Sequence, residues 1–303
     1  MKTQVSNTLI SQAKISTENA SASLYFGASY AALGNVEIIA NESNANGSNA
    51  NGSKAASHLL NHAVNIARAS GQPKLIAPLN GDTWHTYRTI IESSDHAKFF
   101  LEPDSPLSAK LLLDTNFELI AQYSSSLIDL IASKEAIANA VSKREKAIES
   151  SFEIRHLNSN NFNEELKDIF SLSLSAFSNN FLYQAISFEN FAELYQPIKA
   201  YLEDQLVWLA YSHSQLVGLL FAIPDPLNKG QIILKSVAVH PQFEGLGIAS
   251  YLLGRAHSEA IKLGFTHSVQ ALYKDENRSA ALTAGLVAKV IRRYGIFALD
   301  LTA

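Results

Sequence analysis

Apolar residues recur along this chain with a helical period in some segments and an extended period in others. A three-and-four spacing predicts helices over residues 55–69, 84–94, 107–114, 127–150, 161–177, 248–263 and 279–288, with one or two shorter pieces in 188–202. Alternating or continuous short apolar runs predict strands over residues 22–32, 36–40, 74–77, 117–124, 152–157, 206–211, 215–223, 231–239, 268–273 and 293–301. This order predicts an α/β fold class, in the mixed α+β sense.

The second half of the chain contains two kinds of strand connection. Residues 206–211 and 215–223 are expected to form a hairpin, whereas 231–239 leads through a helix to 268–273. A hairpin joins antiparallel strands, and a crossover helix joins parallel ones. We therefore expect a central mixed sheet flanked by helices.

Composition narrows the classes of partner and compartment. The chain has 303 residues, a formal net charge of −4, a pI of about 6.1 and no cysteine. A weakly acidic chain offers no cationic field to nucleic acid or anionic lipid, and a chain without cysteine has no disulfide or cysteine nucleophile. The N-terminus lacks the apolar core of a signal peptide, and no apolar run approaches the ~20 residues of a membrane span, so we expect a cytoplasmic protein.

The segment 236–253 contains the motif that carries chemistry. A predicted buried strand, Ser236 to Val239, leads into a loop with Gly245 and Gly247, and the loop leads directly into a helix. Glycines permit tight turns and close approach of a ligand to the backbone. Free amides at a helix N-terminus, together with the positive end of its dipole, form a site for an anion. The alternative reading is an ordinary strand–turn–helix with glycines for geometry alone.

This segment resembles motif A of the GNAT superfamily of N-acetyltransferases, whose signature is Gln/Arg-x-x-Gly-x-Gly/Ala. Gln242, Gly245 and Gly247 match that signature in register, and the resemblance extends over about 152–301. It implies a GNAT-like sheet and acetyl-CoA as co-substrate, without a metal. It implies that the cofactor lies against Val237, Ala238, Val239, Gln242, Gly245, Leu246, Gly247, Ile248, Ala249, Ser250 and Asn277. The Val239 amide would then polarise the thioester carbonyl, as an oxyanion donor.

Members of this family usually transfer the acyl group directly to an amine, which the resemblance implies here too. Asn277 matches an asparagine often placed near the cofactor, although a helix N-cap explains it equally well. The usual tyrosine acid, seven residues later, is replaced by Ala284. Tyr273 and Tyr294 are possible substitutes, and each is also a plausible packed strand residue. Candidates for a general base are Glu244, Asp275, Glu276 and His240, with water as a further alternative.

Two aromatic clusters are candidates for the acceptor side. Tyr183, Phe188, Phe191 and Tyr195 lie where GNAT members build the acceptor wall, although helix packing is the better reading for Phe188 and Phe191. The run Asp82 to Arg88 could bind the acceptor or dock the two halves. A helix start capped by Asp82 or Thr83 is the favoured reading of that run.

The first half follows a similar order of elements. Its helix 55–69 and strand 74–77 parallel 248–263 and 268–273. A repeated Ser-Asn-Ala-Asn-Gly stands in place of the pyrophosphate loop, and we expect it to form a mobile loop. We therefore expect two tandem domains, a degenerate GNAT-like one over 1–126 and a GNAT domain over 151–303, joined by a helical connection over 127–150. A turn at Gly34-Asn35 is expected to join the first two strands.

The leading hypothesis is an enzyme that moves an acetyl group from acetyl-CoA to a primary amine. The alternative is a CoA-binding regulatory or scaffold module without turnover, which the alanine at 284 favours slightly. A longer acyl donor also fits. Protein N-termini, lysines, polyamines, amino acids and antibiotics all stay open as acceptors, and so does the oligomeric state.

Overall fold

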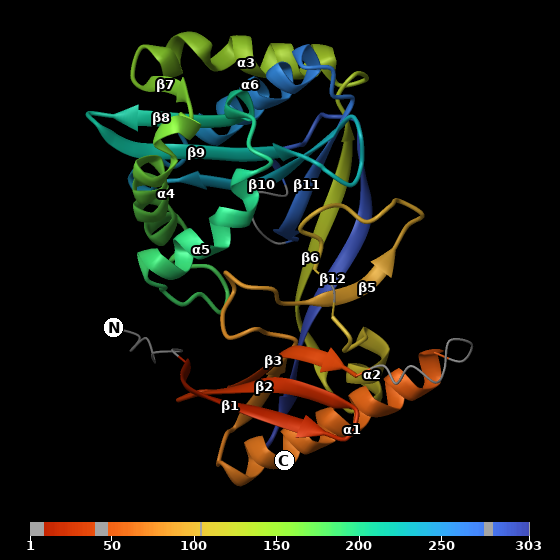
Figure 1. The fold of residues 1–303 in the computed structure, drawn as a ribbon. Coiled ribbons are helices and arrows are strands. Elements are labelled where there is room, and N and C mark those ends of the chain that lie inside the picture. The colour runs from red at the N-terminus through yellow and green to blue at the C-terminus, as the bar shows by residue number, and fades with distance from the viewer. Residues whose placement is uncertain (1–8, 40–47, 104, 276–280, 303) are drawn as a thin grey trace.

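The computed structural model describes residues 9–39, 48–103, 105–275 and 281–302. Within these residues twelve strands form one continuous sheet, and helices cover both of its faces (Figure 1). The strands are β1 (Leu9–Thr17), β2 (Ala20–Gly27), β3 (Ala31–Ile38), β4 (Lys74–Ala77), β5 (Thr89–Ser93), β6 (Glu118–Asp129), β7 (Glu153–His156), β8 (Val207–Ser212), β9 (Gln215–Pro224), β10 (Gln231–Val239), β11 (His267–Lys274) and β12 (Ala288–Asp300). The helices are α1 (Ser48–Ala69), α2 (Ala109–Asp114), α3 (Lys134–Glu149), α4 (Phe162–Phe177), α5 (Phe188–Lys199) and α6 (Ile248–Lys262).

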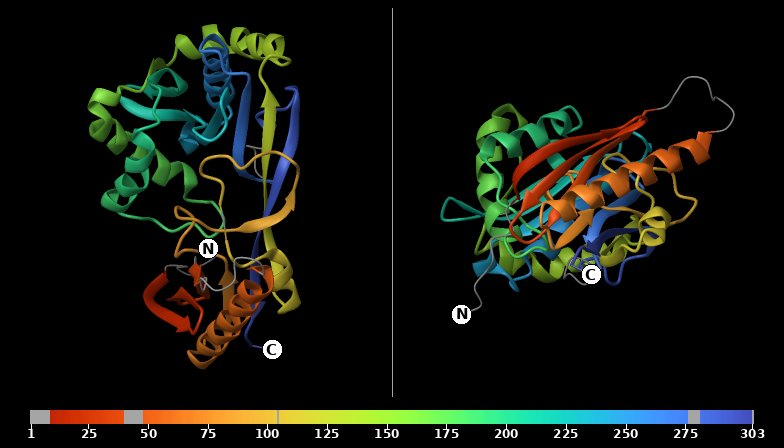
Figure 2. Two further views of the ribbon diagram at one scale, coloured as in Figure 1. Left: turned by 45° about the vertical axis from the view of Figure 1, so that its right-hand side comes forward. Right: turned by 90° about the horizontal axis from the view of Figure 1, so that it is seen from below.

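The two halves share their sheet through two long strands. The strand order is β1-β2-β3-β4-β12-β6-β11-β10-β9-β8-β7, with β5 paired to β12. Thus β12, the last strand of the chain, pairs with β4 of the first half, and β6 of the first half pairs with β11 of the second. Figures 1 and 2 show these two strands running side by side from one half into the other. Each half is therefore completed by a strand that comes from the other.

Each half contains one parallel crossover. In the second half β10 leads through α6 to β11, and in the first half β3 leads through α1 to β4. Both pairs are parallel, as the similar order of elements predicts. The expected mixed sheet flanked by helices is confirmed.

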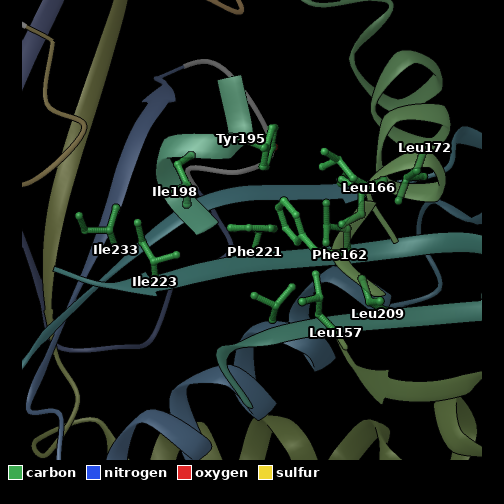
Figure 3. Packing of buried hydrophobic residues seen from close by; sticks show 14 of the residues in the cluster. Leu157, Phe162, Leu166, Leu172, Tyr195, Ile198, Leu209, Phe221, Ile223 and Ile233 are labelled. Atoms are coloured by element: carbon green, nitrogen blue, oxygen red, sulfur yellow. The ribbon is translucent and has the colours of Figure 1, made fainter. Parts of the chain in front are cut away.

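Two apolar layers hold the second half together. The strands β8 and β9 are continuously apolar because both of their faces are buried: Phe221 and Ile223 pack under α4 and α5, while Leu220 and Ala222 pack under α6. Figure 3 shows the layer on the α4–α5 side, where Leu166, Tyr195 and Phe221 converge. Burial on both faces is what a strand inside a helix-covered sheet requires.

Several element predictions are wrong, and all fall where local pattern is ambiguous. Residues 84–94 are not a helix, since 89–93 form β5 against β12, which stabilises a short β-branched run as a strand. The helix predicted from 127 begins at Lys134, because Leu127 to Asp129 continue β6 beside β11. Of the short helix predicted over 279–288, the described residues 281–287 form turns and residue 288 begins β12.

The beginning of the chain also differs from expectation. β1 was not predicted, and β2 turns into β3 at Ala28 to Tyr30, so Gly34 and Asn35 lie inside β3. The second copy of the polar repeat, residues 48–52, forms the start of α1 and not a loop. The rest of that repeat lies outside the described residues.

Candidate functional site

A gap opens between two parallel strands of the second half. β10 and β11 pair from Gln231↔His267 to Leu234↔Gln270, and no pairing joins them beyond that point. A bulge at Lys235 shifts the register of β10 against β9 there, and a second bulge shifts β11 against β6 between Gln270 and Tyr273. Bulges bend strands away from their neighbours, so the two shifts account for the divergence.

The backbone of β10 presents amides to this gap. The His240 amide donates to the Val217 carbonyl at 2.8 Å, so His240 and Val217 are a hydrogen-bonded pair of the antiparallel ladder with β9. Bonded and non-bonded pairs alternate in such a ladder. The amides of Val237 and Val239 therefore point away from β9 and into the gap, while Ala238 bonds to β9.

The loop after β10 ends in a helix start without a side-chain cap. Residues 241–243 form one 3₁₀ turn, and Gly245 and Gly247 then adopt φ of +83° and +86°, which only glycine adopts without strain. Gly247 is the N-cap of α6 and provides no side-chain acceptor to the first-turn amides. A Cβ on Gly245 would meet nothing within 4 Å, so the loop is open on that side. Leu246 is 56% exposed at its tip.

A cation from α3 lies against this loop. A Cβ built on Gly247 would lie 3.2 Å from Nε and 3.3 Å from Cδ of Arg144. The helix that carries Arg144 is held on α6 by close packing at Gly254, and by Glu149, which accepts hydrogen bonds from Tyr251 at 2.5 Å and Arg255 at 2.8 Å. Sequence reasoning missed Arg144, because a run of surface charges on a helix indicates only a solvated face.

The predicted cofactor residues thus occupy one continuous stretch beside the gap. Val237, Ala238 and Val239 end β10, Gln242 lies in the 3₁₀ turn, Gly245 to Gly247 form the loop, and Ile248 to Ser250 form the first turn of α6. Asn277 and Glu276 lie outside the described residues. The arrangement can hold an elongated ligand whose anionic part meets the helix start and whose chain pairs with β10.

The tyrosine candidates differ sharply in environment. Tyr294 is fully buried, donates to Glu102 at 2.8 Å, and its pKa is raised by burial, so it is a packed strand residue. Tyr273 lies on β11 beyond the last β10 pair, and its hydroxyl meets that of Ser126 at 2.7 Å. Ala284 lies in the turn before β12. Of the two tyrosines, only Tyr273 lies on a strand that borders the gap.

The carboxylate and imidazole candidates are less well placed for base chemistry. Asp275 accepts from Gln122 at 2.6 Å and lies 3.4 Å from Arg293, so it is engaged in the sheet. His240 caps the 3₁₀ turn through its Nδ1, and Glu244 is exposed in the loop. This leaves no described carboxylate aimed into the gap with an evident catalytic role.

The aromatic clusters meet at the interface of the two halves. Trp84 packs its ring against Phe177, Tyr183 and Phe191, and its Nε1 donates to the Gln184 carbonyl at 2.7 Å. The segment around Trp84 is a turn tied by Asp82, which accepts from the amides of residues 84 and 85, so the predicted helix start is wrong. Docking of the halves is its observed role. Phe188 and Phe191 belong to the apolar layer under α4 and α5, as expected.

Comparisons with known proteins agree with this geometry. The acetyltransferase (GNAT) family model matches residues 166–284. Among solved structures, a GCN5-related N-acetyltransferase from Sphaerobacter thermophilus is similar with a TM-score of 0.53 at 11% identity, over 93% of this chain and 77% of that one. A tandem GNAT protein from the clavulanic acid biosynthesis pathway is similar with a TM-score of 0.54 at 13% identity, over 93% and 79%. No curated protein sequence matches this chain.

The described residues contain no group of three or more histidine, aspartate or glutamate side chains that could hold a metal ion. No helix within the described residues combines the length and the hydrophobicity that a membrane span requires. With the family match over the gap, loop and α6, and with the fold of a tandem GNAT protein over nearly the whole chain, residues 166–284 are a domain of the acetyltransferase (GNAT) family.

Proposed function

We propose that this protein transfers an acetyl group from acetyl-CoA directly to an amine, in the gap between β10 and β11. The observation that carries the proposal is the open gap with two inward-facing amides, continued by an uncapped helix start. Acetyl-CoA has a pyrophosphate that suits such a helix start, and an amide-rich arm that suits the free edge of β10.

The backbone would supply the main catalytic effect. As the amine nitrogen attacks the thioester carbon, negative charge develops on the carbonyl oxygen, and the amide of Val237 or Val239 would donate a hydrogen bond to it. A preorganised donor of this kind contributes about 3 kcal/mol to transition-state stabilisation. The C–S bond then breaks, the thiolate of CoA leaves and takes up a proton, and the amine loses one to water.

Tyr273 is the side chain we propose as the proton donor to the thiolate. It lies on β11, which borders the gap, and its hydroxyl is held by Ser126 of β6. It would stand in for the tyrosine that family members carry where this chain has Ala284. Substitution Tyr273→Phe should lower kcat by at least tenfold with acetyl-CoA affinity unchanged.

A second function is a CoA-binding module without turnover, which Ala284 favours. Acetyl-CoA binding is common to both functions, and release of the CoA thiol in the presence of an amine separates them. Thiol release above the rate without amine supports the enzyme, and binding alone supports the module.

The first experiment is calorimetric titration of acetyl-CoA into the wild type and a Gly245→Trp variant. Gly245 faces open space beside the helix start, so the indole would occupy the place proposed for the pyrophosphate. The control is Gly264→Trp, because Gly264 has a similar φ of +89° with nothing within 4 Å, at the other end of α6. We expect loss of binding in the first variant alone. Absence of wild-type binding, or equal loss in both variants, would contradict the proposal.

A further inference from the structure

Arg88 is a buried cation at the junction of the two halves. It is only 5% exposed, and it adopts a positive φ of 78°, which is a strained conformation for a residue of its size. Its guanidinium lies 3.8 Å from the centre of the Tyr87 ring and 4.1 Å from that of Tyr123. Its Nη1 donates to the carbonyl of Leu272 at 3.0 Å. The side chain thus reaches from the first half to β11 of the second.

This guanidinium has donors left over. Arg155, Arg255 and Arg292 each have a carboxylate within 3.1 Å, namely Glu165, Glu149 and Glu102. Among the residues that the structure describes, Arg88 has no such partner, and its buried Nε has no hydrogen-bond acceptor. A buried charge costs a great deal unless it is paired, and cation–π contact with two tyrosine rings offsets only part of that cost. The unused donors therefore point to an anion that is not part of this chain.

Lys235 is a second cation, and it lies on β10 beside the gap. It lies at the bulge of β10, and its Nζ is 3.9 Å from the centre of the Tyr195 ring, a residue of α5. Within the described parts of the chain no carboxylate forms an ion pair with it either. Lys235 is one residue beyond the last β10–β11 pair, and Leu272, to which Arg88 is bonded, is two residues beyond it. Lys235 therefore lies on one wall of the gap, and Arg88 is bonded to a residue of the other wall.

Both cations lie on the side of the sheet that the α4–α5 segment covers. Tyr195 of α5 contacts Lys235, while Leu182, in the connection between α4 and α5, packs in one cluster with Leu272 and Tyr123. The pyrophosphate loop leads instead into α6, whose buried side belongs to the apolar layer on the other face. The cations are thus on the side left for the acceptor.

We propose that the acceptor carries a carboxylate as well as its amine, and that Arg88 and Lys235 recognise it. This inference rests on the proposed function. A guanidinium packed against ring faces can present its in-plane N–H donors to a planar carboxylate, and a lysine at the bulge adds a mobile second charge. Amino acids and other amino-carboxylates fit this site, and polyamines, which would bring further positive charge to it, do not.

The test uses matched pairs of amines that differ only in the carboxylate. β-Alanine is paired with β-alaninamide, and lysine with both lysinamide and cadaverine. Each compound is titrated into the full chain saturated with CoA, so that binding is measured without turnover. We expect the carboxylate member of each pair to bind at least tenfold more tightly, because a charge-assisted hydrogen bond is lost in its partner. Equal affinity, preference for the uncharged member, or no binding by any compound would overturn the inference.

Variants assign the effect to the two residues. Lys235→Met retains the apolar stem beside Tyr195 and should reduce the preference for the carboxylate by at least threefold, while acetyl-CoA affinity stays within twofold of the wild type. Arg88→Gln should reduce the preference for the carboxylate further, provided that the circular dichroism spectrum of this variant is native. Lys229→Met, an exposed lysine in the turn after β9, is the matched control and should retain the full preference. An unchanged preference in Lys235→Met would count against the assignment even if Arg88→Gln does not fold.

Failure of this inference is distinguishable from failure of the proposed function. If acetyl-CoA does not bind, the proposed function fails, and the carboxylate inference that rests on it fails too. If acetyl-CoA binds and thiol is released with cadaverine as readily as with lysine, the acetyltransferase proposal stands and the carboxylate inference is wrong.

Discussion

The two halves of this protein contain the same crossover, but only one leaves a gap in the sheet. In the second half β10 and β11 separate after four paired residues, and the loop into α6 has two glycines with positive φ. In the first half β3 and β4 also separate early, after Ala31↔Leu75 and Ala32↔Ile76. There the chain after β4 fills the space: the Leu79 amide donates to the Leu33 carbonyl at 2.8 Å, and the Asn80 side chain accepts from the Asn35 amide at 2.7 Å.

The difference teaches that a divergent strand pair is not by itself a binding site. An extended ligand can pair with a strand only where the backbone amides and carbonyls have no protein partner. In the first half, the Leu33 carbonyl and the Asn35 amide are already bonded within the protein. We therefore propose that the first half is a degenerate GNAT-like domain that binds no CoA, and that the chain binds one acetyl-CoA and not two. Calorimetry would contradict this with a stoichiometry near two.

The largest expected effect is a loss of stability at Gly34 of β3, where the chain after β4 packs most closely against that strand. A Cβ on Gly34 would lie 2.4 Å from the Leu79 carbonyl oxygen and 2.6 Å from Cα of Asn80, and backbone atoms cannot move aside cheaply. Gly34→Ala should lower the free energy of unfolding by about 2–3 kcal/mol. Urea denaturation would measure it, with Gly52→Ala as control, because a Cβ there meets only Ile38 at 3.9 Å. Equal stability of the two variants would mean that the backbone around Gly34 has room for a methyl group.

The two crossover helices, α1 and α6, also differ in the side chains that they bury. The described buried side chains of α1 are all apolar, whereas α6 buries His257, whose Nε2 meets the Ser268 hydroxyl at 3.1 Å. Burial lowers the pKa of His257 to about 4, below its usual 6.5. The unfolded state therefore binds more protons than the folded state between these values, so stability is full above pH 6.5 and decreases as pH falls toward 4.

At pH 5 this histidine should account for a loss of about 2 kcal/mol relative to pH 8. Urea denaturation at both pH values would measure it. His257→Asn should remove most of the difference while lowering stability at pH 8. A wild-type stability that does not change between pH 8 and pH 5 would contradict the assignment.

A smaller effect is expected at Arg144, which lies beside the open loop and has no described counterpart at α1. If the loop holds a pyrophosphate, Arg144→Gln should weaken acetyl-CoA binding by roughly three- to tenfold, in line with about 1 kcal/mol for a partly exposed ionic contact. The loss should be greater at low salt, because screening weakens the same contact in the wild type. Lys143→Gln, an exposed neighbour on α3, is the matched control. Equal losses in both variants would indicate a general charge effect.

The smallest expected effect is a loss of stability at Asn80, whose side chain bonds to β3 in the first half. Asn80→Ala removes the bond to the Asn35 amide and should lower stability by about 1 kcal/mol. It should not create a second acetyl-CoA site, because the Leu79 backbone still pairs with Leu33. A second binding event in this variant would show that one asparagine separates the two halves.

Long or strongly patterned elements were predictable from sequence, and elements stabilised by distant partners were not. The helix 248–263 and the strands 215–223 and 231–239 have apolar patterns that only one structure satisfies, and all three were predicted within a few residues. β5 was missed, because a five-residue strand owes its existence to β12, nearly two hundred residues away. The predicted strand corresponding to β6 ends too early for the same reason. Its last residues have a helical apolar pattern, and only their pairing with β11 makes them a strand.

By itself, the sequence determined the strand–loop–helix segment at 236–253 and its family resemblance, because glycine spacing and helix initiation are local properties. Tertiary structure alone decided three things: the exchange of β6 and β12 between the halves, the closure of one gap and not the other, and the approach of Arg88 to β11 and of Arg144 to the loop. These depend on contacts between residues far apart in the chain, and a local pattern contains no information about which distant surface will bury it.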